Sequence, residues 1–149
     1  MTVESPLPPL AGKKALVVGI ANEHSIAYGC AKAFCAQGAE LAVTYLNDKA
    51  KPHVEPLAQG LAAPIIMPLD VSRPGELEAV FAAVAEQWGR LDILVHAVAF
   101  APKADLQGGL LNCSAEGFAL AMDISCHSFI RMARLAAPLM TEGGTLFAM

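Results

Sequence analysis

A short stretch near the amino end, residues 15–29, combines residue types that can hold a phosphate group. Four apolar residues, 15–18, predict a buried parallel strand, and Gly19 interrupts them. Ser25 follows a short loop at the predicted start of a helix, where its hydroxyl oxygen could accept a hydrogen bond from a first-turn N–H. Such a turn favours an anion, because unpaired N–H groups and the positive end of the helix dipole both face it.

The glycines of this stretch do not meet the usual dinucleotide-binding pattern G-x-G-x-x-G, because the middle glycine is missing and the interval is longer. Gly19 is expected to let the backbone approach a ligand closely, and Gly29 to let the helix pack tightly on the strand. Spacing alone leaves two interpretations open. One is a dinucleotide site, and the other is a plain strand–loop–helix unit in which Ser25 only caps the helix.

The elements that would position this turn alternate along the chain. Strands are predicted at 15–18, 40–45, 64–69, 91–95 and 145–149, and helices at 25–37, 49–59, 74–88 and 115–140. Pro74 is expected at the first position of its helix. Ser114 is expected to cap the last helix, and Gly143 and Gly144 are expected to end it. Residues 103–113 are predicted to form a polar loop. This alternation predicts an α/β fold, a doubly wound, Rossmann-like parallel sheet of order 3-2-1-4-5. Its ligand crevice would lie at the carboxyl ends of strands one and four.

Length and composition narrow the function classes. The 149 residues, 55% hydrophobic with a net charge of −4, suffice for one domain over 13–149 that follows a flexible lead-in at 1–12. No basic run is present, so no nucleic acid partner is expected. No segment reaches the roughly 18 apolar residues of a membrane span, and we expect a cytoplasmic protein. The four cysteines form no C-x-x-C pair, so no metal site is expected.

The residues around the first turn also carry a family resemblance. Gly-Ile-Ala-Asn-Glu-His-Ser-Ile-Ala-Tyr-Gly at 19–29 closely resembles the first turn of the bacterial enoyl-acyl-carrier-protein reductases, divergent members of the short-chain dehydrogenase/reductase family. The resemblance continues at 38–45, 70–71, 96–102 and 122–125 and runs to Met149. It implies an NADH-dependent reduction of the trans-2 double bond of an enoyl-acyl-carrier-protein thioester in fatty-acid synthesis. It also implies a homotetramer with the helix at 115–140 in the interface.

The same resemblance implies individual contacts at the cofactor. Gly19, Ser25 and Ile26 would contact the pyrophosphate and its ribose, and Asp70 and Val71 the adenine. Asp70 could instead only cap the next turn. In the family the loop after strand four touches the nicotinamide ribose and then the acyl substrate, which assigns Val98 to the cofactor and Ala101 to the substrate. His96, at the end of that strand, is interpreted as a structural histidine.

The adenosine end departs from the family in one residue. Leu46 stands where the family often has a glutamine, so this side chain could pack on the adenosine without bonding to it. Strand two does not end in an acidic residue that could bond to the ribose hydroxyls. Asp48 is close in sequence, but so are Lys49 and Lys51, which could suit a 2′-phosphate. The residues do not decide between NADH and NADPH, and the resemblance favours NADH.

The groups that complete the reduction are expected elsewhere. In the family a tyrosine hydroxyl stabilises the enolate and a lysine holds the nicotinamide ribose, and both follow strand five. We expect this pair beyond Met149, so that the sheet is truncated after strand five and the chain alone is inactive. Tyr45 and Lys49 spell Y-x-x-x-K, but they follow strand two at the adenosine end and are interpreted as a coincidence. With an edge strand exposed, the chain is expected to associate or to be marginally stable.

Two alternatives remain open. The first is another short-chain reductase that acts on a carbonyl, although that family more often shows Asn-Ala-Gly where this chain has 96–102. The second is a nucleotide-binding or interaction module without catalysis.

Overall fold

The computed structural model describes residues 7–149 and contains a parallel sheet with the order β3-β2-β1-β4-β5, which confirms the predicted topology. Residues 1–6 of the predicted lead-in lie outside the described part. Each observed strand begins and ends within two residues of its predicted bounds. The strands are β1 (Lys14–Val18), β2 (Glu40–Tyr45), β3 (Ile65–Pro68), β4 (Ile93–His96) and β5 (Thr145–Ala148).

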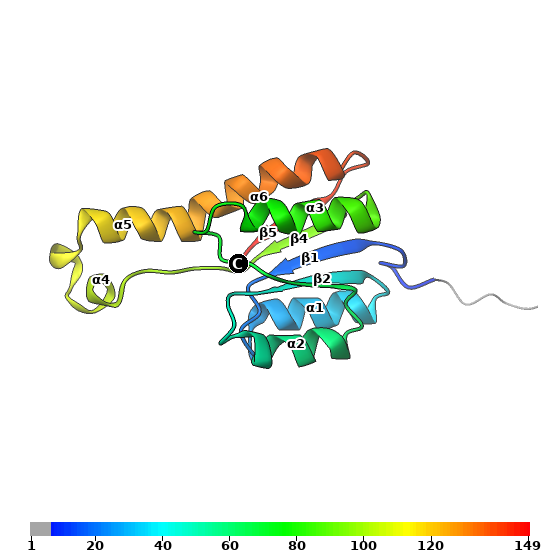
Figure 1. Ribbon diagram of the computed structural model, residues 1–149, viewed down its shortest axis with the longest axis horizontal. Coiled ribbons are helices and arrows are strands. Elements are labelled where there is room, and N and C mark those ends of the chain that lie inside the picture. Colours follow the sequence, from blue (N-terminus) through cyan, green and yellow to red (C-terminus); the bar gives the residue numbers. More distant parts are fainter. Residues whose placement is uncertain (1–6) are drawn as a thin grey trace, which may run out of the picture.

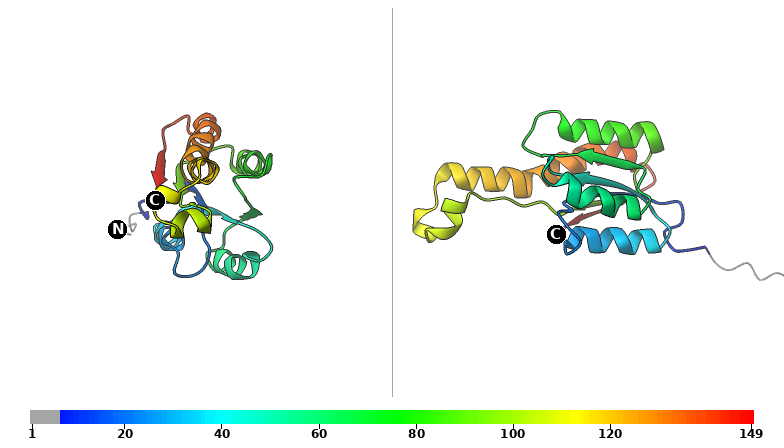
Figure 2. Two further views of the ribbon diagram at one scale, coloured as in Figure 1. Left: turned by 90° about the vertical axis from the view of Figure 1, so that its left-hand side faces the viewer. Right: turned by 60° about the horizontal axis from the view of Figure 1, so that its bottom comes forward.

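Helices cover both faces of the sheet (Figures 1 and 2). The helices α1 (Ile26–Ala36) and α2 (Lys51–Gly60) lie on one face. The helices α3 (Glu76–Trp88) and α6 (Ser128–Ala136) lie on the other. The arrangement is the doubly wound one, and no helix within residues 7–149 is both long and apolar enough to cross a bilayer.

The core explains why β1 reads as an unbroken apolar run. Leu16 and Val18 pack in the cluster on the α3 and α6 face, whereas Ala15 and Val17 pack in the cluster on the α1 and α2 face. All four side chains are at most 1% exposed. Successive strand residues point to opposite faces, so a strand covered on both sides must be apolar at every position.

The start of α3 differs from its prediction. Pro74 lies in the preceding turn, and the helix begins at Glu76 with Gly75 as its N-cap at a φ of 87°. Leu77, Val80, Phe81 and Val84 recur at helical spacing, and all four are buried on one face of the helix. The predicted end is also observed, because Gly89 closes the helix in a left-handed conformation with a φ of 66°.

The single helix predicted at 115–140 is four consecutive pieces. They are α5 (Ala115–Met122), the π-turn η2 (Asp123–His127), α6 and the short 3-10 turn η3 (Ala137–Leu139), so the helix ends before the two glycines. Ser114 caps α5 as predicted, since its Oγ accepts a hydrogen bond from the Gly117 N–H at 2.9 Å. The hydroxyl of Ser128 donates to the Ile124 carbonyl at 2.6 Å, a local bond of the kind that bends helices.

The polar loop predicted at 103–113 contains the helix α4 (Lys103–Gln107) and the 3-10 turn η1 (Leu110–Asn112). Asp105 ties this segment to α5, because its Oδ1 accepts a hydrogen bond from the Ser114 N–H at 2.6 Å. Together α4, η1 and α5, residues 103–122, form an arm that projects beyond the carboxyl ends of the strands (Figures 1 and 2). Several of its large apolar side chains are exposed, namely Leu106, Leu110, Leu111 and Phe118.

Candidate functional site

A cavity of about 530 Å³ opens at the carboxyl ends of β1 to β4. The strand order reverses between β1 and β4, and this is the place where open α/β sheets bind their ligands. The volume lies in the usual range for a small-molecule site. The lining residues are Val18, Gly19, Ile20, Ala21, Thr44, Leu46, Leu69, Asp70, Val71, Ser72, Ala97, Val98, Ala99, Phe100, Leu120 and Ile124.

Most of the cofactor contacts implied by the resemblance meet at this cavity. Residues from four different strand ends are brought together there: Gly19, Leu46, Asp70, Val71 and Val98. Three predicted contacts lie outside the lining, namely Ser25, Ile26 and Ala101. Ser25 and Ile26 lie at the start of α1, and Ala101 lies between the cavity wall and α4.

Ser25 acts differently from its prediction. It occupies the N-cap position of α1, but its Oγ accepts hydrogen bonds from the N–H groups of Ala21 at 2.9 Å and Asn22 at 3.0 Å rather than from the first helical turn. Within the described residues no side chain caps this turn. The hydroxyl therefore shapes the loop, and the first N–H groups of α1 are left available for an anion.

The two glycines of the first turn have separate outcomes. Gly19 has a φ of 111°, and a Cβ there would collide with the carbonyl oxygen of Ala97, in the chain that continues β4. The chain that continues β4 therefore requires a glycine at this position, and the close approach of a ligand at Gly19 stays a prediction. The packing role predicted for Gly29 is wrong, because a Cβ at that position would meet no atom within 4 Å.

Asp70 is the one ionisable side chain among the described residues that line the cavity. Its Oδ1 accepts hydrogen bonds from the Ser72 N–H at 2.9 Å and the Ser72 hydroxyl at 2.6 Å, and its own N–H donates to Glu76 at 2.6 Å. The carboxylate therefore caps the turn after β3 and also faces the cavity. Since the described lining holds no lysine or arginine, a bound anion would depend on backbone N–H groups.

The opposite wall was missed by the sequence analysis. Leu120 and Ile124, from α5 and η2, face the cavity together with Phe100 from the loop after β4. Leu120 and Ile124 are four residues apart, so helical periodicity places them on one face. It does not tell which neighbour that face meets, because the direction in which the helix leaves the sheet depends on the loop before it.

His96 is a buried histidine at the end of β4, as predicted. Its side chain is 2% exposed, and its Nε2 lies 2.6 Å from the hydroxyl oxygen of Ser128. Because that hydroxyl donates to Ile124, the Nε2 of His96 must be the donor in this pair. Burial lowers the pKa of His96, which favours the neutral ring.

The Y-x-x-x-K spacing does not place a tyrosine at the site. Thr44 and Leu46 line the cavity, but Tyr45 between them packs in the core cluster of the opposite face and is 8% exposed. The ammonium of Lys51 lies over its ring at 5.8 Å. Alternation along β2 thus turns the Tyr45 hydroxyl away from the cavity.

Comparison with known proteins adds relatives. The family model described as enoyl-(acyl carrier protein) reductase matches residues 19–149. The chain is 44% identical over 138 residues to enoyl-(acyl-carrier-protein) reductase (NADH) 2 of Rhizobium meliloti, which covers 93% of this chain and 52% of that protein. It is 45% identical to the reductase (NADH) FabI of Aquifex aeolicus, over 88% of this chain and 48% of that protein.

Solved structures agree with these relatives. The crystal structure of the reductase (NADH) from Aquifex aeolicus matches with a TM-score of 0.88 and 43% identity, over 92% of this chain and 55% of that one. A reductase from Anaplasma phagocytophilum, crystallised in complex with NAD, matches with a TM-score of 0.87 and 47% identity, over 92% of this chain and 53% of that one. The chain spans about half the length of the curated relatives it matches.

Proposed function

The chain belongs to the enoyl-(acyl carrier protein) reductase family, and on that premise we propose that it forms the NADH-binding part of such an enzyme. The whole enzyme would reduce the trans-2 double bond of an enoyl thioester carried on acyl carrier protein. The observation that carries the proposal is the cavity at the carboxyl ends of β1 and β4, beside a helix whose first turn no described side chain caps.

Each end of the cavity suits one end of a dinucleotide. Leu46, Asp70 and Val71 would bind the adenosine, and the loop from Gly19 to the start of α1 would bind the pyrophosphate. Val98, on the β4 side, would contact the nicotinamide ribose. NADH, when bound, supplies the hydride. Both relatives are named as NADH reductases, which supports NADH over NADPH as the cofactor.

The residues of this chain position the cofactor rather than stabilise the enolate. The described cavity lining is mostly apolar, its polar side chains are Thr44, Asp70 and Ser72, and it contains neither tyrosine nor lysine. The Tyr and Lys that the family uses remain predicted beyond Met149. We therefore propose that the 149 residues bind NADH without turnover, and that Ala101 begins the path taken by the acyl chain.

The arm supports a further part of the proposal, a homo-oligomer. Its exposed leucines, Leu106, Leu110 and Leu111, together with Phe118, leave apolar surface in contact with water. A second copy of the chain would cover it. The enzyme would meet its acyl-carrier-protein substrate in the cytoplasm.

Two measurements on the 149-residue chain test the proposal. Titration of NADH, followed by its fluorescence, should saturate, and a crotonyl thioester added with NADH should not be consumed. A chain extended through the downstream segment should consume it. Failure to bind NADH would refute the cofactor site. Turnover by the 149 residues alone would refute the division of labour, and binding without turnover in the extended chain would favour a non-catalytic nucleotide-binding module.

A further inference from the structure

The loop that follows β4 forms one wall of the cavity with very few tethers of its own. Val98, Ala99 and Phe100 line the cavity. Among residues 7–149, no backbone group of 98–101 bonds to another backbone group. A wall that lacks backbone pairing needs some other contact to hold it at a fixed distance from the opposite side.

Ser125 supplies that contact. Its Oγ accepts a hydrogen bond from the Phe100 N–H at 3.0 Å, and its hydroxyl donates to the Phe100 carbonyl at 3.3 Å. One hydroxyl therefore satisfies both backbone groups of a residue 25 positions earlier in the chain. In the described part of the chain these are the only hydrogen bonds made by residues 98–101.

Ser125 belongs to a segment that hydrogen bonds join to the sheet. It belongs to the π-turn η2, and its neighbour Ile124 lines the cavity. The Ile124 carbonyl accepts from Ser128, which in turn accepts from His96 at the end of β4. Ser128 is fully buried and His96 nearly so, so this chain of hydrogen bonds joins the turn firmly to the sheet. Single π-turns within α-helices are found frequently at functional sites.

We propose that Ser125 is a positioning residue that sets the place of the Val98–Phe100 wall and thereby the width of the cavity on its β4 side. The inference rests on the proposed function, in which that side receives the nicotinamide half of the cofactor. The adenosine half would bind two strands away at Leu46 and three strands away at Asp70, and in the described part of the chain the Ser125 hydroxyl bonds to neither. Ser125 should therefore matter for NADH and not for ADP, which lacks the nicotinamide half.

Three variants test this role. Ser125→Ala removes both hydrogen bonds, and Ser125→Thr keeps the hydroxyl. Ser114→Ala is the matched control, because it removes a hydroxyl from the cap of α5 in the arm, away from the cavity. Two lost hydrogen bonds should raise the NADH dissociation constant about 5- to 10-fold in Ser125→Ala, while that for ADP changes by less than about twofold. Ser125→Thr should restore most of the affinity, and Ser114→Ala should leave both constants unchanged.

Exchange of the Phe100 amide hydrogen, followed by NMR without any nucleotide, tests the tether directly. It should be several-fold faster in Ser125→Ala and near the original rate in Ser125→Thr. Unchanged exchange, an unchanged NADH constant, or an equal loss of NADH and ADP would each overturn the inference. If the original chain binds neither nucleotide, the proposed function is wrong and the inference falls with it, an outcome distinct from the selective failures.

Discussion

At the amino ends of β1 and β4, charged side chains neutralise one another, whereas at the carboxyl ends of the same strands polar groups are left facing a cavity. Asp92 accepts hydrogen bonds from the Lys14 N–H at 2.9 Å, the Lys13 ammonium at 3.2 Å and the Arg90 guanidinium. Glu40, at the start of β2 on the other side of β1, accepts from the Lys14 ammonium at 2.7 Å. Burial alone would raise the pKa of Asp92, but these hydrogen bonds hold it below its usual value.

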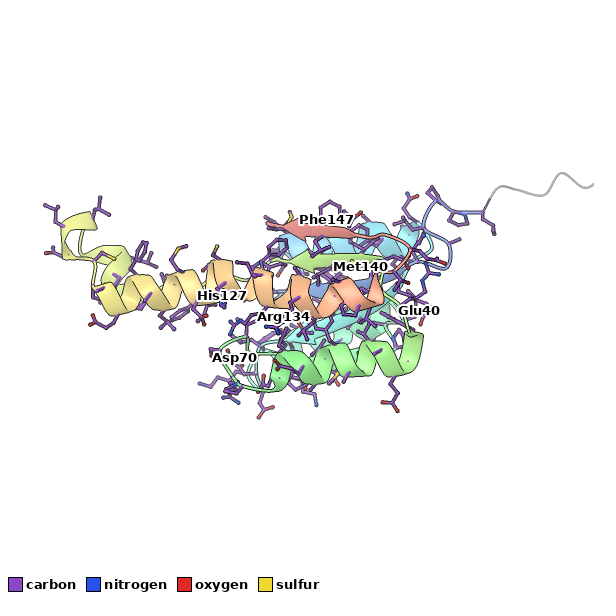
Figure 3. The ribbon with its side chains drawn as sticks, turned by 90° about the horizontal axis from the view of Figure 1, so that it is seen from above. Glu40, Asp70, His127, Arg134, Met140 and Phe147 are labelled. Atoms are coloured by element: carbon purple, nitrogen blue, oxygen red, sulfur yellow. The ribbon has the colours of Figure 1, made fainter. Side chains whose placement is uncertain are left out.

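The carboxyl ends have the opposite character. Asp70 lies there, at the far end of the sheet from Glu40 (Figure 3), and the first turn of α1 has no side-chain cap in the described chain. The charge pairs around the nearly buried Asp92 of the amino ends contribute to the fold. At the carboxyl ends, Asp70 bonds only within its own turn, to Ser72 and Arg73, and it also lines the cavity, while the first N–H groups of α1 are available to a ligand. The two ends of one sheet should therefore respond differently to substitution, one in stability and the other in affinity.

Gly19 should affect both stability and NADH affinity, and we expect its replacement to have the largest effect on both. Gly19→Val combines a left-handed φ with a collision against the Ala97 carbonyl, so we expect a loss of more than about 3 kcal/mol in the free energy of unfolding. NADH binding should disappear with it. Urea unfolding and NADH titration measure the two effects.

Gly29→Ala is the matched control for that substitution. Its Cβ would enter open space in the interior of α1, so stability should rise by about 0.5–1 kcal/mol and affinity should not change. A Gly19→Val chain that unfolds like the original would contradict the geometry of the first turn.

Asp92→Asn tests the amino end alone. The carboxylate is 9% exposed and has three cationic or N–H donors, so its loss should cost about 2–3 kcal/mol of unfolding free energy. The NADH dissociation constant, measured below the unfolding transition, should stay within about twofold.

Asp70→Ala is the mirror of that substitution. It removes a half-exposed turn contact, so stability should fall by about 1 kcal/mol or less while NADH binding weakens several-fold. If Asp92→Asn weakened NADH binding more than Asp70→Ala, the division between the two ends would be wrong.

The two ends should also separate in pH. Burial lowers the pKa of His96, so the unfolded chain gains a proton near pH 6.5 that the folded chain does not. The contribution of His96 is therefore complete above about pH 6.5. It is lost as the pH falls from there toward the folded pKa, by at most about 1.4 kcal/mol per pH unit.

The pKa of Asp92 is lowered from 3.8, so its contribution is lost only in a more acidic range. Urea midpoints at pH 7.5, 6.5 and 5.5 measure the effect of His96, and His96→Gln should remove the slope between them. A flat profile for the original chain would show that the pKa of His96 is the same in the folded and unfolded chains.

Whether a feature of the fold or the site could be predicted from the sequence depended on how far apart in the chain its contacting residues lie. The strand positions followed from the alternation of apolar runs with helical segments, most clearly for β1, β2 and β4, which are buried almost throughout. The strand order followed from the rules for crossover connections in parallel sheets. The cavity followed from that order. Its far wall did not, because Leu120, Ile124 and the Ser125 tether depend on the direction in which α5 and η2, which begin only at Ala115, run past the carboxyl end of β4.

Local chemistry misled the prediction where two partners competed for one group. Ser25 and Ser114 both precede a helix and both resemble caps in sequence. Only Ser114 bonds to its helix, because the loop before Ser25 turns back and presents the Ala21 and Asn22 N–H groups first. The glycine at 29 misled in another way, since its small size suggested a close contact that the structure does not contain.

The pair of serines gives the smallest and most local test of the comparison. Ser25→Ala removes two hydrogen bonds from an exposed loop, so stability should fall by only about 0.5–1 kcal/mol and the NADH dissociation constant should rise about threefold. Amide exchange should quicken at Ala21 and Asn22 and stay unchanged at Ala27, in the first turn of α1. In Ser114→Ala the faster amide should lie within the helix, at Gly117. Faster exchange at Ala27 in the Ser25 variant would mean that the hydroxyl caps the helix after all, and the first turn of α1 would then have no N–H groups to spare for a phosphate.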